Sequence, residues 1–298
     1  MIDDWRIDKD GAFDVASLGS LRDWSHGGRL GNWLTANGQS NPDFKLNAGE
    51  AYRVRLINAC NSRVLRLKLA GHEADVVALD GQPLAKVQKL KGDAITLAPA
   101  QRADLVVAPH KAGRFMFEEV SGQAPFGYAS ITVSGSAQRA KVPKLPPAEI
   151  PRPDLDTARR ISIVMTGGAM GQMGEMIYNG KPLDRETMLK TKQVWAFNGI
   201  ANRTNEPFFT ANRGQSVVLE LVNETRWPHA MHTHGHHFRQ ISRNGTAIDD
   251  EPWRDTILIR RGEKMEITFV ADSPGKWLLH CHMLEHAAAG MNTWFEVV

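Results

Sequence analysis

The sequence predicts an all-β fold made of two β-sandwich domains in tandem. Its apolar and β-branched residues come in short runs, several with period-2 alternation, such as YRVRLI (52–57), SVVLELV (216–222) and MEITFV (265–270). Asn-Gly, Asp-Gly and Pro-Gly pairs separate the runs. No segment has the long, capped period of a helix. The 298 residues, 42% apolar and 23% charged, are enough for two domains with cores of their own.

The two halves of the chain repeat one pattern. NAGEAYRVRLIN (47–58) aligns with NRGQSVVLELVN (212–223), and GHEADVVALDG (71–81) aligns with GHHFRQISRNG (235–245). AGRFMFEEV (112–120) then aligns with PGKWLLHCH (274–282) at nearly the same offset. Three collinear matches indicate a duplicated β-domain.

A proline-rich stretch separates the copies. KVPKLPPAEIPRPDLD contains five prolines, which cannot continue a sheet and favour a stiff, extended linker. We therefore expect a first domain at residues 1–135, a linker at 136–158 and a second domain at 159–298.

Composition excludes several classes of protein. A net charge of +3 and a pI near 8.9 are too mild to indicate a nucleic-acid partner. No apolar stretch approaches the ~18 residues of a membrane span. The start, MIDDWRIDKDG, lacks the features of a signal peptide. Two cysteines give no disulfide framework, and Cys60 is expected to be a buried free thiol.

LLHCHMLEHAAAGM (278–291) concentrates metal-binding side chains near the C-terminus. If LLHCH is a strand, Cys281 points to one face while His280 and His282 point to the other, so one strand serves two metal sites. His286 and Met291 follow Cys281 at equal spacing. A thiolate, imidazoles and a weak thioether are the ligands of a blue-copper electron-transfer centre, which here still lacks its second imidazole.

The second imidazole comes from WPHAMHTHGHHF (227–238). In a strand His232 and His234 share a face, and His229 lies on the opposite one. The simplest assembly has two sites. One copper is held by His229, Cys281, His286 and Met291, and the second, all-imidazole site by His232, His234, His280 and His282. The first copy of the repeat lacks these ligands, so only the second can hold metal.

These residues resemble a known family. HAMHTHGHHF is similar to the H-P-x-H-x-H-G-H-x-F signature of multicopper oxidases, and HCHMLEHAAAGM to their H-C-H-x3-H-x4-[M/L/F] signature. The two halves resemble the family's middle and C-terminal domains. The resemblance therefore implies two cupredoxin-like Greek-key β-sandwiches.

The resemblance also implies cofactors and a reaction. A type 1 copper would lie at His229, Cys281, His286 and Met291. His232 would bind a type 2 copper, and His234, His280 and His282 the type 3 pair. Cys281, His280 and His282 would carry electrons from a small reducing substrate to the cluster, which reduces O2 to water.

In the family an N-terminal domain with two further H-x-H motifs supplies half of the cluster's imidazoles. Here His26, His72 and His110 stand alone. We therefore expect domains two and three of a periplasmic or secreted three-domain enzyme, with the N-terminal domain as a missing partner. The type 1 site would be complete, and the type 2 and type 3 sites would have half of their ligands.

Three functions remain open. The first is a laccase-like multicopper oxidase that acts on phenols, aromatic amines or Cu(I), and an axial Met291 favours a modest potential and easily oxidised substrates. The second is a copper-binding or electron-transfer module that does not reduce O2. The third, a copper nitrite reductase, is disfavoured because those enzymes have a longer loop between the cysteine and the next histidine.

Other residues have two interpretations. Methionines in MTGGAMGQMGEM could bind Cu(I) or fill gaps in a flexible loop. Asp255 could support a ligand histidine or be a surface carboxylate. Ala287 stands where some relatives carry an acid thought to relay protons. We expect His236 and His237 to be structural. The methionines are Met165, Met170, Met173 and Met176.

Overall fold

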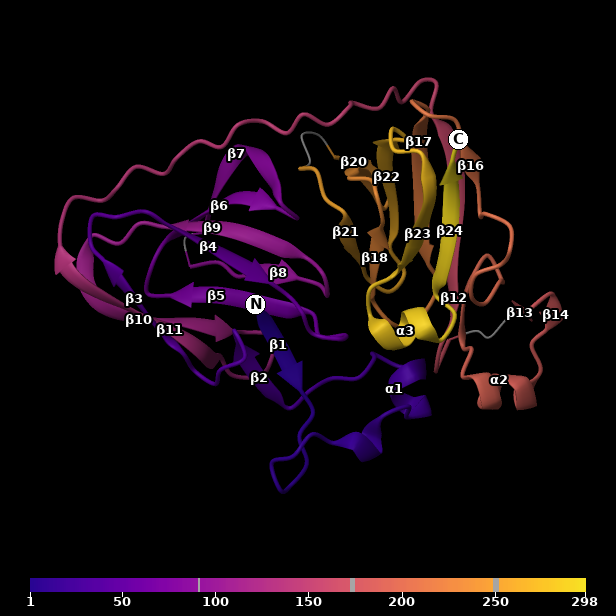
Figure 1. Cartoon of the computed structure of the whole chain (residues 1–298), viewed down its shortest axis with the longest axis horizontal. Helices are drawn as coiled ribbons and strands as arrows, with labels where there is room; N and C mark the ends of the chain where they lie inside the picture. Colours follow the sequence, from indigo (N-terminus) through magenta and orange to yellow (C-terminus); the bar gives the residue numbers. More distant parts are fainter. Residues whose placement is uncertain (91, 172–174, 249–251) are drawn as a thin grey trace. The chain divides into compact units, whose positions relative to one another are not determined.

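The computed structural model describes residues 1–90, 92–171, 175–248 and 252–298 (Figure 1). The described chain is nearly all-β, which confirms the predicted fold class. It forms two compact units. The first contains Met1–Asp14 and Leu30–Ala148, and the second contains Val15–Arg29 and Glu149–Val298. None of the described helices is both long and apolar enough to cross a membrane.

The first unit is a sandwich of a four-stranded and a five-stranded sheet, beside a short pair of strands, β1 (Ile2–Trp5) and β2 (Trp33–Ala36). The four-stranded sheet has the order β4 (Tyr52–Ile57), β9 (Arg102–Val107), β6 (Ala74–Leu79) and β7 (Gln82–Leu90). The five-stranded sheet has the order β3 (Asp43–Asn47), β11 (Phe126–Ser136), β10 (Lys111–Glu119), β5 (Leu65–Ala70) and β8 (Ile95–Leu97).

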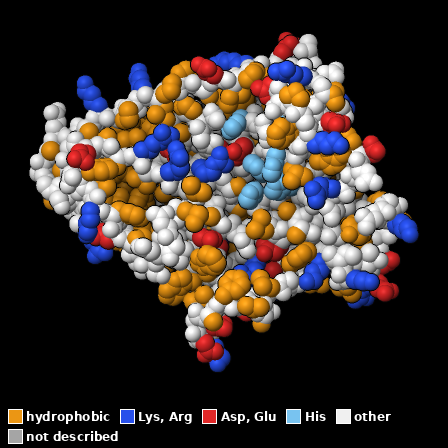
Figure 2. All heavy atoms as spheres, viewed as in Figure 1, with side chains coloured by type: hydrophobic (Ala, Val, Ile, Leu, Met, Phe, Trp, Pro, Cys, Tyr) orange, Lys and Arg blue, Asp and Glu red, His pale blue; other side chains and the backbone are white. Residues whose placement is uncertain are grey.

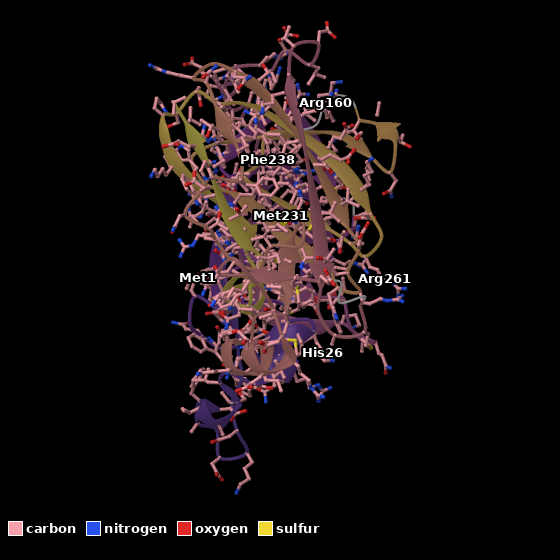
Figure 3. All side chains as sticks on the ribbon, turned by 90° about the vertical axis from the view of Figure 1, so that its right-hand side faces the viewer. Met1, His26, Arg160, Met231, Phe238 and Arg261 are labelled. Carbon is pink, nitrogen blue, oxygen red and sulfur yellow. The ribbon has the colours of Figure 1, made fainter. Side chains whose placement is uncertain are left out.

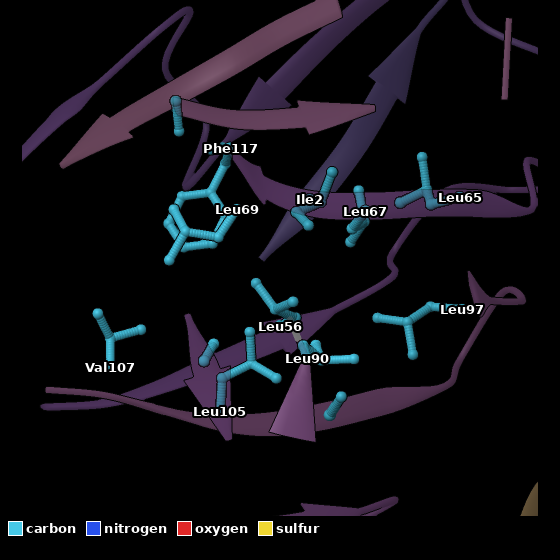
Figure 4. Packing of buried hydrophobic residues seen from close by; sticks show 14 of the residues in the cluster. Ile2, Leu56, Leu65, Leu67, Leu69, Leu90, Leu97, Leu105, Val107 and Phe117 are labelled. Carbon is cyan, nitrogen blue, oxygen red and sulfur yellow. The ribbon is translucent and has the colours of Figure 1, made fainter. Parts of the chain in front are cut away.

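The core of the first unit lies between its two sheets (Figure 4). In β5 the sequence LRLKLA alternates between buried leucines and more exposed cations, as a strand with one face on a core requires. Leu65 and Leu67 of β5 are buried in the same cluster as Leu56 of β4 and Leu105 of β9. Each such side chain contributes roughly 1.5–3 kcal/mol when it is fully buried.

The second unit repeats this layout with more strands. Met231 and Phe238 lie buried inside it (Figure 3). Its six-stranded sheet has the order β15 (Trp195–Phe197), β12 (Arg159–Gly167), β17 (Ser216–Asn223), β22 (Lys264–Val270), β19 (Arg239–Arg243) and β20 (Thr246–Ala247). Its five-stranded sheet has the order β16 (Thr210–Ala211), β24 (Asn292–Val297), β23 (Gly275–Cys281), β18 (His229–Thr233) and β21 (Thr256–Ile259).

Short elements complete the second unit. Helix α3 follows β23 closely, and the strand pair β13–β14 precedes α2. The bounds of these elements are η1 (Val15–Ser17), α1 (Leu21–Ser25), β13 (Ile177–Tyr178), β14 (Lys181–Pro182), α2 (Arg185–Thr191) and α3 (Leu284–Ala288).

The two units share a strand order and a side-chain motif. The order β4-β9-β6-β7 recurs as β17-β22-β19-β20, and β3-β11-β10-β5-β8 recurs as β16-β24-β23-β18-β21. Asn58, at the end of the first copy's strand, accepts a bond from the amide of Cys60 at 3.0 Å. Asn223 accepts one from the amide of Thr225 at 3.0 Å. The repeat seen in the sequence is therefore also a repeat of topology and of this turn.

The boundary between the units differs in one respect from the expected domains. Residues 137–158 form no strand or helix, and the division falls at Ala148 and Glu149, inside the expected linker. Residues 15–29, however, belong to the second unit and not to the first. The reason is local bonding, because the Trp24 carbonyl accepts the Trp195 indole N–H at 2.7 Å.

We predict that Asn58→Ala destabilises the first unit without affecting metal chemistry. The side-chain amide of Asn58 donates through Nδ2 to the carbonyls of Arg63 and Leu97, both at 2.8 Å. Unpaired buried partners cost about 1–3 kcal/mol each, so the free energy of unfolding in urea should fall by at least that order. Asn61→Ala, three residues away, is the control. Equal unfolding curves for Asn58→Ala and the wild type would contradict the role of this turn.

Candidate metal centres

The antiparallel pairing of β18 with β23 brings the two histidine motifs together. Met231 lies opposite Cys281, and His232 lies opposite His280. Because side chains alternate along each strand, the pair presents two different faces. His229 is two residues from Met231 in the same strand, so its side chain lies on the same face as that of Cys281. Helix α3 then brings His286 back to the end of β23 (Figure 1).

The first cluster is a buried triangle of one sulfur and two nitrogens. Cys281 Sγ lies 3.7 Å from Nδ1 of His229 and 3.8 Å from Nδ1 of His286, and the two Nδ1 atoms are 3.0 Å apart. All three side chains are fully buried. Two imidazoles and one cysteine in this form are the core of a blue-copper site.

The outer nitrogens of both imidazoles are bound to oxygen. His286 Nε2–H donates to the carbonyl of His26 at 2.6 Å. His229 Nε2–H donates to Thr225 Oγ1 at 2.8 Å, because that hydroxyl uses its own proton on Asn223 Oδ1 at 2.8 Å. A neutral imidazole with Nε2 protonated has a bare Nδ1. Two lone pairs therefore face each other beside Cys281, an arrangement that a bound cation relieves.

Burial sets the protonation of this cluster. It lowers the pKa of His229 well below its usual value, with a smaller effect from His286, and it lowers the pKa of His286 to about 4. It raises the pKa of the Cys281 thiol to about 12. Both imidazoles are thus neutral at pH 7, and a metal ion would displace the thiol proton. The donor set fits copper.

Met291 is fixed beside these residues through its backbone. Its side chain is fully buried. Its carbonyl accepts the amide N–H of Cys281 at 3.0 Å, and its amide donates to the carbonyl of His286 at 2.9 Å. Trp195 adds an apolar wall, with ring centroids 4.5 Å from His286 and 5.1 Å from His229.

The opposite face of the strand pair carries a second group of imidazoles. His234 Nε2 lies 3.1 Å from His280 Nε2, and His232 completes the closest trio. The His282 ring lies 5.5 Å from the rings of both His232 and His280. These side chains are only partly buried, and Figure 2 shows imidazoles gathered on the molecular surface.

Hydrogen bonds orient this second group as well. His232 Nδ1–H donates to the Asp255 carbonyl at 2.9 Å, and His280 Nδ1–H donates to the Cys281 carbonyl at 2.9 Å, so Nε2 is the atom that each ring can offer to a metal ion. Burial lowers the pKa of His234 and His282, and that of His280 to about 4. His282 Nδ1 is buried without a hydrogen-bond partner. Neutral imidazoles with bare nitrogens fit metal binding.

Neighbouring residues take different positions. The carboxylate of Asp255 is 3.6 Å from His232 Nδ1 and 4.0 Å from His237 Nε2. His236 packs between aromatic rings, including Phe269 at 5.1 Å and Phe295 at 5.4 Å. Cys60 is a buried free thiol.

The methionines of the segment at residues 165–176 differ in burial. Met165 and Met176 are buried, as gap-filling residues would be, whereas Met170 is 69% exposed. Met173 lies outside the described residues.

Sequence reasoning missed the contribution of His26. It treated this histidine as standing alone, whereas its peptide carbonyl holds His286. No signal in the sequence could have shown this, because every residue has a carbonyl. Thr225 was also missed, although its place in the repeated asparagine turn was a detectable signal.

Comparison with known proteins supports one family. Two family models described as multicopper oxidase match residues 19–129 and 179–298. Multicopper oxidase MmcO of Mycobacterium tuberculosis is 28% identical over 258 residues, which are 86% of this chain and 48% of that protein. A multicopper oxidase of Staphylococcus aureus is 26% identical over 290 residues, 96% of this chain and 56% of that one. The chain thus spans about half the length of these curated relatives.

Solved structures agree. A multi-copper oxidase from Pseudomonas thermotolerans matches with a TM-score of 0.78 and 28% identity, over 100% of this chain and 66% of that one. Lac15, from a marine microbial metagenome, matches with a TM-score of 0.70 and 33% identity, over 100% and 64%. Because multicopper oxidase family models match both halves of the chain, the chain belongs to the multicopper oxidase family.

Proposed function

We propose that the second unit holds a type 1 copper and half of a three-copper cluster, in a laccase-like oxidase. The oxidase would remove single electrons from a small reducing substrate and reduce O2 to water. The observation that carries the proposal is the strand pair β18–β23, which together with α3 has a buried Cys–His–His triangle on one face and four imidazoles on the other. The type 1 ligands would be His229, Cys281, His286 and Met291. The others would be His232 for type 2 and His234, His280 and His282 for type 3.

The main chain around Cys281 connects the two faces by a short covalent path. Bound copper would supply one-electron chemistry at both. Cys281 is bonded through the main chain to His280 on one side and His282 on the other. Its carbonyl also accepts the Nδ1–H of His280 at 2.9 Å. Each face is thus linked to the other by a few covalent bonds and one hydrogen bond.

Protons are needed as well as electrons, since O2 reduction to two waters takes four of each. Ala287 has no acidic side chain, so it cannot relay protons. Asp255, with a 14% exposed side chain 3.6 Å from His232, is a carboxylate at the second cluster. Its position supports the interpretation that it orients a ligand histidine, and it is a candidate source of protons.

A second function is favoured by the incomplete ligand set. Four imidazoles are half of what the family's three-copper cluster uses, so the isolated chain could be a copper-binding or electron-transfer module. We propose that a further N-terminal domain supplies the rest. The reducing substrate, whether phenol, aromatic amine or Cu(I), and a periplasmic or secreted location are proposals at the same level.

The copper-loaded chain should be blue, and Cys281→Ser should be colourless. The colour of a type 1 site comes from the bond between copper and thiolate, which serine cannot form. Cys60→Ser, which changes the other buried thiol, is the matched control and should stay blue. Absorption spectra with a copper count decide this. A colourless wild type with bound copper would remove the type 1 assignment.

Thr225→Val should weaken copper binding about 10–100-fold, because it removes the oxygen that holds His229 Nε2–H. Thr225→Ser keeps that oxygen and should stay close to the wild type. Competition against a chelator of known affinity measures the effect. Urea unfolding of the copper-free variants separates it from a change in stability. Equal affinity in Thr225→Val and Thr225→Ser would contradict the role of the hydroxyl.

The copper-loaded chain alone should accept an electron at the type 1 site but consume O2 slowly or not at all. A partial ligand set binds copper weakly, and the imidazoles of the second face are partly exposed. Loss of the blue colour under argon reports electron acceptance, and an oxygen electrode reports turnover. Adding the missing domain, fused or in trans, should restore uptake. Rapid uptake by the chain alone would show that its own histidines complete the cluster.

A further inference from the structure

A peptide from far along the chain covers the outer edge of His286. His286 is fully buried, and its Nε2–H donates to the His26 carbonyl at 2.6 Å. Residues 15–29, here called the strap, belong to the second unit, and their helix α1 contacts α3, which carries His286 (Figure 1). The strap therefore occupies the hydrogen-bonding position that an organic electron donor would need at this imidazole.

The strap is fixed on both sides of His26. The Trp24 carbonyl accepts the indole N–H of Trp195 at 2.7 Å, and the Ser25 carbonyl accepts the amide N–H of Ala169 at 2.7 Å. The three consecutive carbonyls of Trp24, Ser25 and His26 thus each accept a hydrogen bond from the rest of the second unit. Trp195 is itself packed against His286.

The strap is also held near its two ends. The ammonium group of Lys192 donates to the Gly19 carbonyl and lies 5.1 Å from the centroid of the Trp24 ring. The amide of Arg29 donates to the carboxylate of Glu285 at 3.1 Å. Opening the strap breaks these bonds together, so the closed form is favoured.

Aromatic packing seals the cover. The His26 ring lies 5.3 Å from the Trp227 ring, and a Cβ at Gly27 would meet Trp227 at 3.4 Å. The Trp227 indole N–H donates to the Ala169 carbonyl at 3.1 Å. The strap therefore packs against Trp227 of the same unit at both His26 and Gly27.

We propose that the strap determines donor specificity, because it withholds His286 Nε2–H from phenols and aromatic amines. This inference rests on the proposed type 1 site. Organic donors react through the minor open form, and their rate is reduced by its small population. A metal complex that transfers an electron without contact reacts with the closed form. In that reaction the metal donor would give one electron to a bound copper, with no proton or ligand transferred, whereas a phenol would give one electron and release its proton to solvent.

The first test needs no copper. Diethyl pyrocarbonate modifies accessible imidazoles, and mass spectrometry of peptides locates the adduct. In the copper-free chain the exposed His110 should react readily while His286 stays unmodified. Lys192→Gly removes the side chain that holds Gly19 and Trp24, and glycine suits the φ of 58° at that position. It should raise the modification rate of His286 about tenfold. Lys190→Ala, on the exposed side of α2, is the control.

The second test follows the loss of blue colour under argon. Hydroquinone should bleach the Lys192→Gly chain about tenfold faster than the wild type, in proportion to the open fraction. Hexaammineruthenium(II), which cannot bind the imidazole, should bleach both at similar rates. A chain with residues 16–27 replaced by Gly–Ser residues of equal length keeps the backbone carbonyls but loses the contacts of the Trp24 and His26 rings with Lys192 and Trp227, so it should also bleach faster with hydroquinone than the wild type.

Two results would overturn the inference. One is modification of wild-type His286 as fast as His110. The other is an unchanged hydroquinone rate in the strap variants when their His286 has become reactive. If no blue colour forms in the wild type, the type 1 assignment fails, and the modification experiment still decides whether the strap is a closed cover.

Discussion

The register between β18 and β23 is the constraint on which both candidate sites depend. With His232 opposite His280 and Met231 opposite Cys281, each strand gives one set of side chains to each face. A shift of one strand by one residue would move all of that strand's groups to the opposite face from their present partners. The register is held because both faces have fixed surroundings. One is closed by Trp195 and the buried triangle, and the other carries the imidazoles.

The hydrogen bonds to the outer nitrogens have two different origins. Thr225 belongs to a turn that both units share, in which an asparagine holds the amide two residues later. In the first unit Cys60 occupies that place, so the turn is part of the scaffold, and in the second unit Thr225 of this turn also bonds a histidine, His229. The His26 carbonyl comes instead from a segment whose sequence neighbours belong to the first unit. His229 is therefore held by a turn that both units share, and His286 is held by the strap, residues 15–29.

Much of this arrangement could be predicted from the sequence because it depends on strict alternation. The faces of Cys281, His280 and His282 follow from a period of two, and the two-fold repeat follows from collinear matches. Helix α3 could not be foreseen, because its five residues are too short to show a helical period. The strap could not be foreseen either. Its bonds to Trp195, Ala169 and His286 use backbone carbonyls, which have no sequence signature.

The two clusters differ in what closes them. Every group around the first, from Thr225 to the His26 carbonyl, comes from the second unit, so its bare nitrogens and thiol can be satisfied by one cation. The second leaves His282 Nδ1 buried and unpaired, and an unpaired buried polar atom costs about 1–3 kcal/mol. The outer nitrogens of the first group are thus paired within the second unit, whereas the second group keeps a buried nitrogen that a bound metal ion could pair.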